Sequence, residues 1–169
     1  MRRAFTLIEL IAVMAIASTL AVVAASSVSA VERAGQSAFA LDVERAVRDT
    51  RSVAMSSGVP AGVSLDLSAG ALSFLTLDSA GATVIPRTGP TGDSAPDLRA
   101  GALHASAGIS SFVHGDGATG DGSIWFDAGG SPQIRQGDGS FTPFTQNAAI
   151  TCTDASVITV WMTTGAVVR

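Results

Sequence analysis

The sequence contains no lysine, so its positive charge comes from arginine alone. Fourteen acidic residues outnumber ten basic ones, which gives a net charge of −4 at pH 7. This balance excludes the broad basic footprint that is typical of nucleic-acid-binding domains. We therefore do not expect nucleic acid as a partner.

Cysteine is almost absent. The single thiol, Cys152, excludes an intrachain disulfide and a cysteine-based metal cluster. We expect Cys152 to be buried as a small apolar side chain within a strand. The fold must then be held by packing alone.

Residues that carry enzyme chemistry are scarce. The only histidines, His104 and His114, lack the neighbours of a catalytic triad or a zinc site, and we interpret them as ordinary loop residues. The segment 115–122 (GDGATGDG) could offer two carboxylates to calcium, but it lacks the spacing and bidentate Glu of an EF-hand loop. Asp-Gly turns explain it without a metal. The sequence predicts no enzyme, no cofactor and no metal site.

One long stretch has almost no charge. Residues 5–31 contain a single ionisable side chain, Glu9, and no glycine or proline. At about 1.5 Å rise per residue, the uncharged run 10–31 spans roughly 33 Å, enough to cross the apolar core of a bilayer. Arg2 and Arg3 precede it, so the positive-inside rule places residues 1–4 in the cytoplasm and the bulk of the chain outside. We predict a single-pass membrane protein.

Glu9 is costly in this position. A carboxylate in lipid costs several kcal/mol unless a cation or a proton neutralises it, and the next basic residue along the chain is Arg33. Cleavage after Ala4 would create a new α-amino group on Phe5, about one helical turn away. That amine could pair with Glu9 of the same chain or of a neighbouring copy, and the second pairing would make Glu9 an assembly device.

The N-terminal residues RRAFTLIEL (2–10) resemble the class III signal of type IV prepilins and type II secretion pseudopilins. The resemblance implies that prepilin peptidase cleaves between Ala4 and Phe5 and methylates the new amine of Phe5. It also implies that Glu9 is the carboxylate used in helix pairing and assembly. The family usually has glycine where this chain has Ala4. The protein would then lie in a bacterial inner membrane, with its C-terminal domain in the periplasm.

Three other interpretations of the apolar stretch stay open. A secretory signal peptide could be cleaved near Ala30, although the run is longer than the usual apolar region of about 7–15 residues. A simple membrane anchor and a chance match are the others.

Residues 32–57 continue as an amphipathic helix. Apolar positions from Phe39 to Ala54 recur at spacings of three and four, which predicts one face towards a core. Glu44 and Arg48 are spaced for an attraction between side chains one turn apart. Gly58 and Pro60 predict the end of the helix. The other face is expected to be solvated, and a nucleic-acid contact is the less favoured interpretation. The charged residues of this face are Arg33, Asp42, Glu44, Arg45, Arg48, Asp49 and Arg51.

From Pro60 the hydrophobic period changes to that of strands, giving a β-rich globular domain over 58–169. A hairpin is expected over 62–67 and 71–77, a loop over 87–102, and an irregular hairpin over 131–144. Further strands are expected at 82–85, 103–113, 123–127 and 156–162, with a flexible segment at 114–122 and a closing turn at 163–165. Gly35 is the one candidate hinge in the preceding helix. The predicted fold class is α+β, with a long N-terminal helix, transmembrane in its first half, packed on an antiparallel β-sandwich.

Three later segments resemble the GspH/FimT branch of the pilins. They are RSVAMSSG (51–58), IWFDAGG (124–130) and the hairpin from VITV (157–160) to Gly165. The resemblance implies a structural role as a GspH-like minor pseudopilin of type II secretion, in contact with other minor pseudopilins or secreted cargo. A FimT-like minor type IV pilin is one alternative, and a membrane-tethered module that binds DNA or another polymer is a second. The C-terminal GAVVR (165–169) lacks the Gly-Arg-x-Arg signature of FimT-like proteins linked to DNA uptake.

Overall fold

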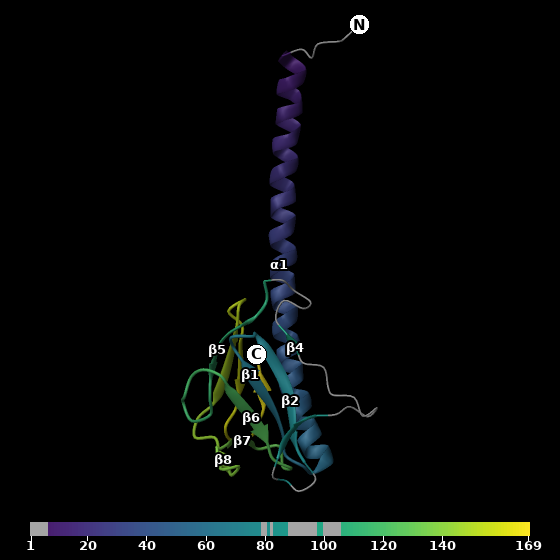
Figure 1. Ribbon diagram of the computed structural model, residues 1–169. Helices are drawn as coiled ribbons and strands as arrows, with labels where there is room; N and C mark the ends of the chain where they lie inside the picture. The colour runs from purple at the N-terminus through teal and green to yellow at the C-terminus, as the bar shows by residue number, and fades with distance from the viewer. Residues whose placement is uncertain (1–6, 79–80, 82, 88–97, 100–105) are drawn as a thin grey trace.

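The computed structural model describes residues 7–78, 81, 83–87, 98–99 and 106–169 (Figure 1). Its longest element is one helix, α1 (Leu7–Ser57), whose 51 residues span about 75 Å. One half of α1 projects from the rest of the chain, and the other half lies along a β-rich domain. The long helix predicted from the sequence is therefore present over the residues that the structure describes.

The helix ends where the sequence predicted. Gly58 has a φ of +68°, a left-handed conformation that glycine adopts at little cost, and its N–H donates to the carbonyl of Ala54 at 3.0 Å. Gly35, the candidate hinge, does not interrupt α1. A glycine costs a helix about 1 kcal/mol relative to alanine, which the regular hydrogen bonds on both sides outweigh.

The domain consists of two antiparallel sheets (Figure 1). The larger sheet has the order β3-β2-β1-β6-β7-β8, with β4 also paired to β2, and the smaller sheet has the order β11-β10-β9-β5. The strands are β1 (Ala61–Asp66), β2 (Ala71–Leu77), β3 (Val84–Pro86), β4 (Leu98–Arg99), β5 (Ile109–Val113), β6 (Gly122–Phe126), β7 (Pro132–Arg135), β8 (Phe141–Pro143), β9 (Ala148–Cys152), β10 (Val157–Val160) and β11 (Val167–Val168).

A single hydrophobic core joins the helix and both sheets. Phe39, Val43 and Val47 of α1 are buried against inward-facing residues of the larger sheet, such as Val63 and Ile124. The smaller sheet adds a third set to the same cluster: Phe112, Ile150, Cys152, Ile158 and Val160. The predicted α+β class, with a long helix packed on antiparallel sheets, is confirmed.

Most of the predicted strands are present with shifts of a residue or two. The hairpin over 62–67 and 71–77 is β1–β2, and the irregular hairpin over 131–144 is β7–β8. The loop prediction for 87–102 is wrong at Leu98–Arg99, which form β4 and pair with β2 because Leu98 packs against the core. The strand predicted over 103–113 is confirmed only at Ile109–Val113, and residues 103–105 lie outside the described part of the chain.

The segment 114–122, predicted to be flexible, is an ordered turn. The N–H of His114 donates to the carbonyl of Ala118 at 2.8 Å, and Val113 and Thr119 form an isolated bridge. Cys152 is buried in β9, as expected. Burial raises the pKa of its thiol to about 11, and the charge of Asp154 raises it further by a smaller amount, while the charge of Arg169 lowers it.

Candidate assembly helix and domain clasp

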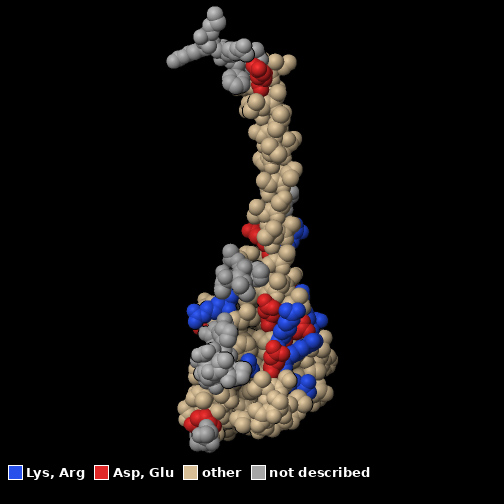
Figure 2. All heavy atoms as spheres, turned by 90° about the vertical axis from the view of Figure 1, so that its right-hand side faces the viewer, with Lys and Arg blue, Asp and Glu red and all other residues tan. Residues whose placement is uncertain are grey.

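The projecting half of α1 is an apolar rod with no burial inside the chain. Every large apolar side chain from Leu7 to Val31 is more than half exposed, from 56% at Leu10 to 78% at Leu7. Figure 2 shows the contrast, since coloured acidic and basic side chains gather on the domain while most of the rod is uncharged. Exposed apolar surface of this extent marks a membrane or protein contact.

The rod is long and apolar enough to cross a bilayer. Within α1, an 18-residue window has a mean hydropathy of 2.4 and is 0% buried within the chain. Two of its hydroxyl groups are satisfied internally, because Ser18 and Thr19 donate to the carbonyls of Ala15 and Ile16 at 2.9 and 2.8 Å. Backbone-bonded hydroxyls of this kind remove a polar cost that lipid would otherwise impose.

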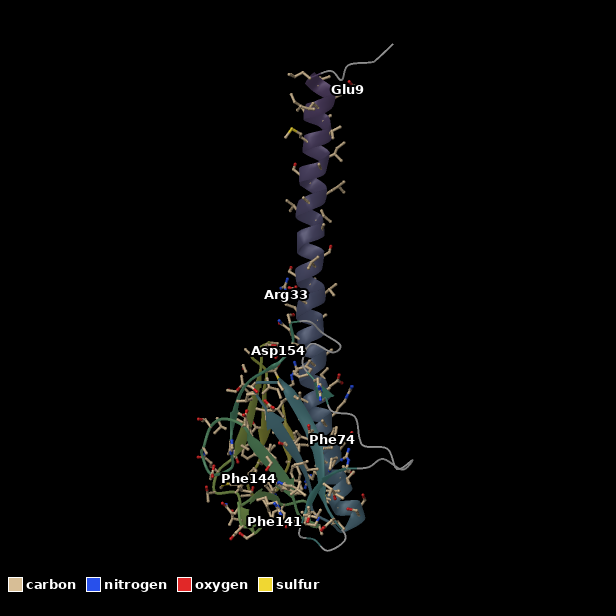
Figure 3. All side chains as sticks on the ribbon, viewed as in Figure 1. Glu9, Arg33, Phe74, Phe141, Phe144 and Asp154 are labelled. Atoms are coloured by element: carbon tan, nitrogen blue, oxygen red, sulfur yellow. The ribbon has the colours of Figure 1, made fainter. Side chains whose placement is uncertain are left out.

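Glu9 lies in the first turn of α1, at the free end of the rod (Figure 3). A carboxylate in the first turn of a helix is favoured by the helix dipole. The cleavage and methylation residues predicted from the sequence, Ala4 and Phe5, lie outside the described residues.

The opposite end of α1 carries the feature that the sequence analysis missed. Arg48 and Arg51, predicted to face solvent, also bind backbone carbonyls of the domain, with Arg48 still exposed and Arg51 half-buried. Arg48 donates from Nε and Nη2 to the carbonyl of Val167, at 3.2 and 2.9 Å. Arg51 donates from Nε to the carbonyl of Gly130 at 3.0 Å and from Nη2 to the carbonyl of Thr164 at 2.8 Å. We call these four hydrogen bonds the arginine clasp.

The prediction of a fully solvated charged face is therefore wrong in part. Glu44 is only 9% exposed, and its Oε1 accepts from Nη2 of Arg48 at 2.7 Å, which confirms the predicted ion pair in a more buried setting. Arg45, by contrast, is exposed and reaches only Asp42, at 3.4 Å. Both arginines therefore donate to backbone carbonyls of the domain, and the side chain of Arg48 is still 56% exposed.

The clasp brings together the three segments that the sequence singled out. Arg51 begins the first, Gly130 ends the second, and Gly165 closes the third. A side chain at Gly165, where φ is +64°, would overlap the carbonyl oxygen of Gly130, and one at Gly130 would meet Met55 and Arg51. The glycines allow the two turns to approach the helix closely enough for Arg51 to reach both carbonyls.

A second junction ties the C-terminal residue to the upper part of the domain. Oδ2 of Asp154 accepts hydrogen bonds from the hydroxyls of Ser156 and Ser37 at 2.7 and 3.3 Å, and it lies 3.5 Å from Nη2 of Arg169. Burial raises the pKa of Asp154, but these hydrogen bonds and the charge of Arg169 outweigh it, so the pKa is lowered overall. The C-terminal region is thus held at both ends by polar contacts.

The remaining candidate groups do not converge. Both carboxylates of the 115–122 segment accept backbone hydrogen bonds: Asp116 from the N–H of Ala118 in its own turn at 2.9 Å, and Asp121 from the N–H of Leu67, at the end of β1, at 2.8 Å. Among the described residues there is no group of three or more potential metal-binding side chains. His114 stacks on Phe112 and contacts the carbonyl of Gly120, while His104 lies outside the described residues.

Comparisons with known proteins agree with this organisation. Residues 1–25 match the family model of the prokaryotic N-terminal methylation motif. The structure is similar to that of the minor pseudopilin EpsH from the type 2 secretion system of Vibrio cholerae, with a TM-score of 0.52 and 16% sequence identity. The match covers 79% of this chain and 94% of that one. A comparison with curated protein sequences finds no match.

The chain joins a prepilin-type N-terminus to a pseudopilin fold. Pilins and pseudopilins are structural subunits rather than enzymes, in agreement with the expectation from the sequence.

Proposed function

We propose that the chain is a minor pseudopilin subunit of a type II secretion pseudopilus. The observation that carries the proposal is an N-terminal methylation motif at the start of an exposed apolar helix on a pseudopilin fold. In this role, residues 1–4 form a leader, residues 5–31 cross the inner membrane before entering the filament, and residues 32–57 and 58–169 lie in the periplasm. Its partners would be prepilin peptidase, inner-membrane lipid, other minor pseudopilins and, at the filament, secreted cargo.

In this role, cleavage, methylation and pairing with Glu9 take place at the free end of the rod. Cleavage between Ala4 and Phe5 creates an amine that is methylated and remains positively charged. Glu9 lies about one helical turn further on, so an amine and a carboxylate are available for pairing where water is scarce. If the amine of one subunit meets Glu9 of the next, this pairing lowers the cost of the carboxylate in lipid when subunits assemble. This makes the apolar rod selective for other processed subunits.

The test is incorporation of a Glu9→Gln variant into filaments in cells that hold the secretion machinery. We expect the variant to remain in the membrane with a folded domain but to be strongly depleted from filaments. The matched control is Glu32→Gln, which removes an exposed carboxylate from the same helix beyond the apolar run. Equal incorporation of Glu9→Gln and the control would refute the role of Glu9.

A second candidate in the same class is a minor subunit of a type IV pilus. The N-terminal methylation motif favours it equally, because pilins and pseudopilins share this processing signal. The genes adjoining this one separate the two: neighbours encoding secretion pseudopilins favour the first proposal, and neighbours encoding pilus components favour the second.

A further inference from the structure

A groove lies on the domain beside the arginine clasp. It has a volume of about 380 Å³ and runs between the last turns of α1 and strand β11. We call it the arginine groove. It is lined by Arg48, Arg51, Ser52, Met55, Ala166 and Val167.

The groove carries positive charge that the domain does not fully neutralise. Glu44 pairs with Arg48, but both hydrogen bonds of Arg51 go to uncharged carbonyls. Among the described residues, no carboxylate lies within 4.0 Å of the Arg51 guanidinium, and Nη1 of neither arginine makes a hydrogen bond. The clasp therefore holds two guanidinium groups in fixed positions and leaves donors on each for a ligand.

The surroundings of these donors are apolar. Met55 is 51% exposed at the groove, and Ala166 and Val167 line its other wall. The turn that Arg51 holds also exposes Trp161 and Met162, by 48% and 41%. A guanidinium beside exposed apolar side chains suits a carboxylate that is itself flanked by apolar groups, because desolvation strengthens the charge-assisted hydrogen bond.

We propose that the arginine groove binds an acidic peptide segment of a partner protein, in which a carboxylate stands next to large apolar side chains. Charge complementarity favours a single carboxylate over a nucleic acid. A polyanion needs several cations in a row to release its counterions, whereas Arg48 is already paired with Glu44 and the neighbouring helix face carries Asp42 and Asp49. The guanidinium of Arg51, whose hydrogen bonds go only to carbonyls, fits one carboxylate, for which arginine is geometrically suited.

The inference deepens the proposed subunit role by naming the chemistry of a partner, and its biological meaning rests on that role. The groove lies at the end of α1 opposite Glu9, so a partner can bind there while the apolar rod is engaged elsewhere. Peptide binding by the purified protein does not require filament assembly. A failure of the groove and a failure of the filament proposal are therefore distinguishable.

The test is a calorimetric titration of the full chain in detergent with two capped peptides. One has the sequence ALDLA, with acetyl and amide ends, and the other is its ALNLA counterpart. We expect the aspartate peptide to bind about tenfold more tightly, because only its side chain makes a charge-assisted bond to the guanidinium groups. Equal affinities for the two peptides would overturn the proposal.

Two variants keep the test independent of folding. Ser52→Glu places a competing carboxylate in the groove without removing either arginine, and it should lower the affinity for ALDLA by about tenfold. Ser56→Glu, on an exposed turn of the same helix, should leave that affinity unchanged. Unchanged affinity of Ser52→Glu for ALDLA would refute the site. So would a single-stranded oligonucleotide that binds the unaltered protein more tightly than ALDLA does and binds Ser52→Glu more weakly.

Discussion

The two halves of α1 carry similar side chains into opposite surroundings. Val43 and Val47 are fully buried, whereas Val13 and Val22 are 58% and 71% exposed on the same continuous helix. The half of α1 that lies along the domain has one apolar stripe, which the two sheets cover. The projecting half is apolar on all sides, so no single face within the chain could cover it. The difference teaches that folding of this chain uses half of its longest element and leaves the other half for an external apolar environment.

The largest expected effect comes from truncating a large apolar side chain to alanine in each half. Phe39→Ala should lower the free energy of unfolding of the domain by about 3 to 5 kcal/mol, because it empties a core position that is only 2% exposed. Ile11→Ala, in the projecting half, should change it by less than about 0.5 kcal/mol. Chemical denaturation of the full chain in detergent, followed by tryptophan fluorescence, measures both. Similar losses for the two variants would contradict the division of α1.

The reactivity of the Cys152 thiol tests whether the core of the domain is buried. With its pKa raised to about 11 by burial, the thiol is almost wholly protonated at pH 8. An unfolded thiol has a pKa near 8.5, so native alkylation should be slower by about two orders of magnitude. Mass spectrometry of protein treated with iodoacetamide, with and without denaturant, gives the two rates. Equal rates would show that β9 is not buried in this way.

The clasp separates two arginines that look alike in the sequence. Arg51→Ala leaves the buried carbonyl of Gly130 without its donor and should cost about 1 to 3 kcal/mol of domain stability. Arg45→Ala removes an exposed side chain and should cost less than about 0.5 kcal/mol. Thermal unfolding of both variants measures the difference. A loss for Arg45→Ala as large as that for Arg51→Ala would show that the carbonyl contacts are not the cause.

The smallest effect is a dependence on acid at the Asp154 junction. The folded pKa of Asp154 is lowered, so its contribution to stability is present above the unfolded pKa of about 3.9 and is lost as the pH falls through the folded value. Asp154→Asn should therefore lower the free energy of unfolding more at neutral pH than at low pH. As a result, the free energy of unfolding of the variant should fall less steeply below about pH 4. Unfolding midpoints between pH 2 and pH 6 measure this slope. An unchanged slope in the variant would assign the acid sensitivity to other carboxylates.

The sequence was informative wherever one local pattern determined the outcome. The three-and-four spacing from Phe39 to Ala54, the stop at Gly58 and the alternation in β1 and β2 each depend on near neighbours, and each was predicted correctly. The burial of Cys152 followed from its lack of any partner thiol.

The clasp could not be predicted because its contacts cross long distances in the chain. Arg51 is 79 residues from Gly130 and 113 from Thr164. An arginine on a helix face has the same local signature whether it points to water or to a carbonyl, so helical periodicity assigned Arg48 and Arg51 to solvent. The only available signal was that Arg51, Gly130 and Gly165 fell in the three segments that resemble one family. In the same way, β4 was missed because two residues carry no strand periodicity.

The assembly role proposed for Glu9 depends most on the state of the N-terminus in cells. Intact-mass and peptide mass spectrometry of the protein purified from its native membrane tests it directly. We predict a mature chain that begins with N-methylated Phe5, which would supply the amine for Glu9. A native chain that retains Met1, or one that begins at Val31 after removal of the whole apolar rod, would contradict the account.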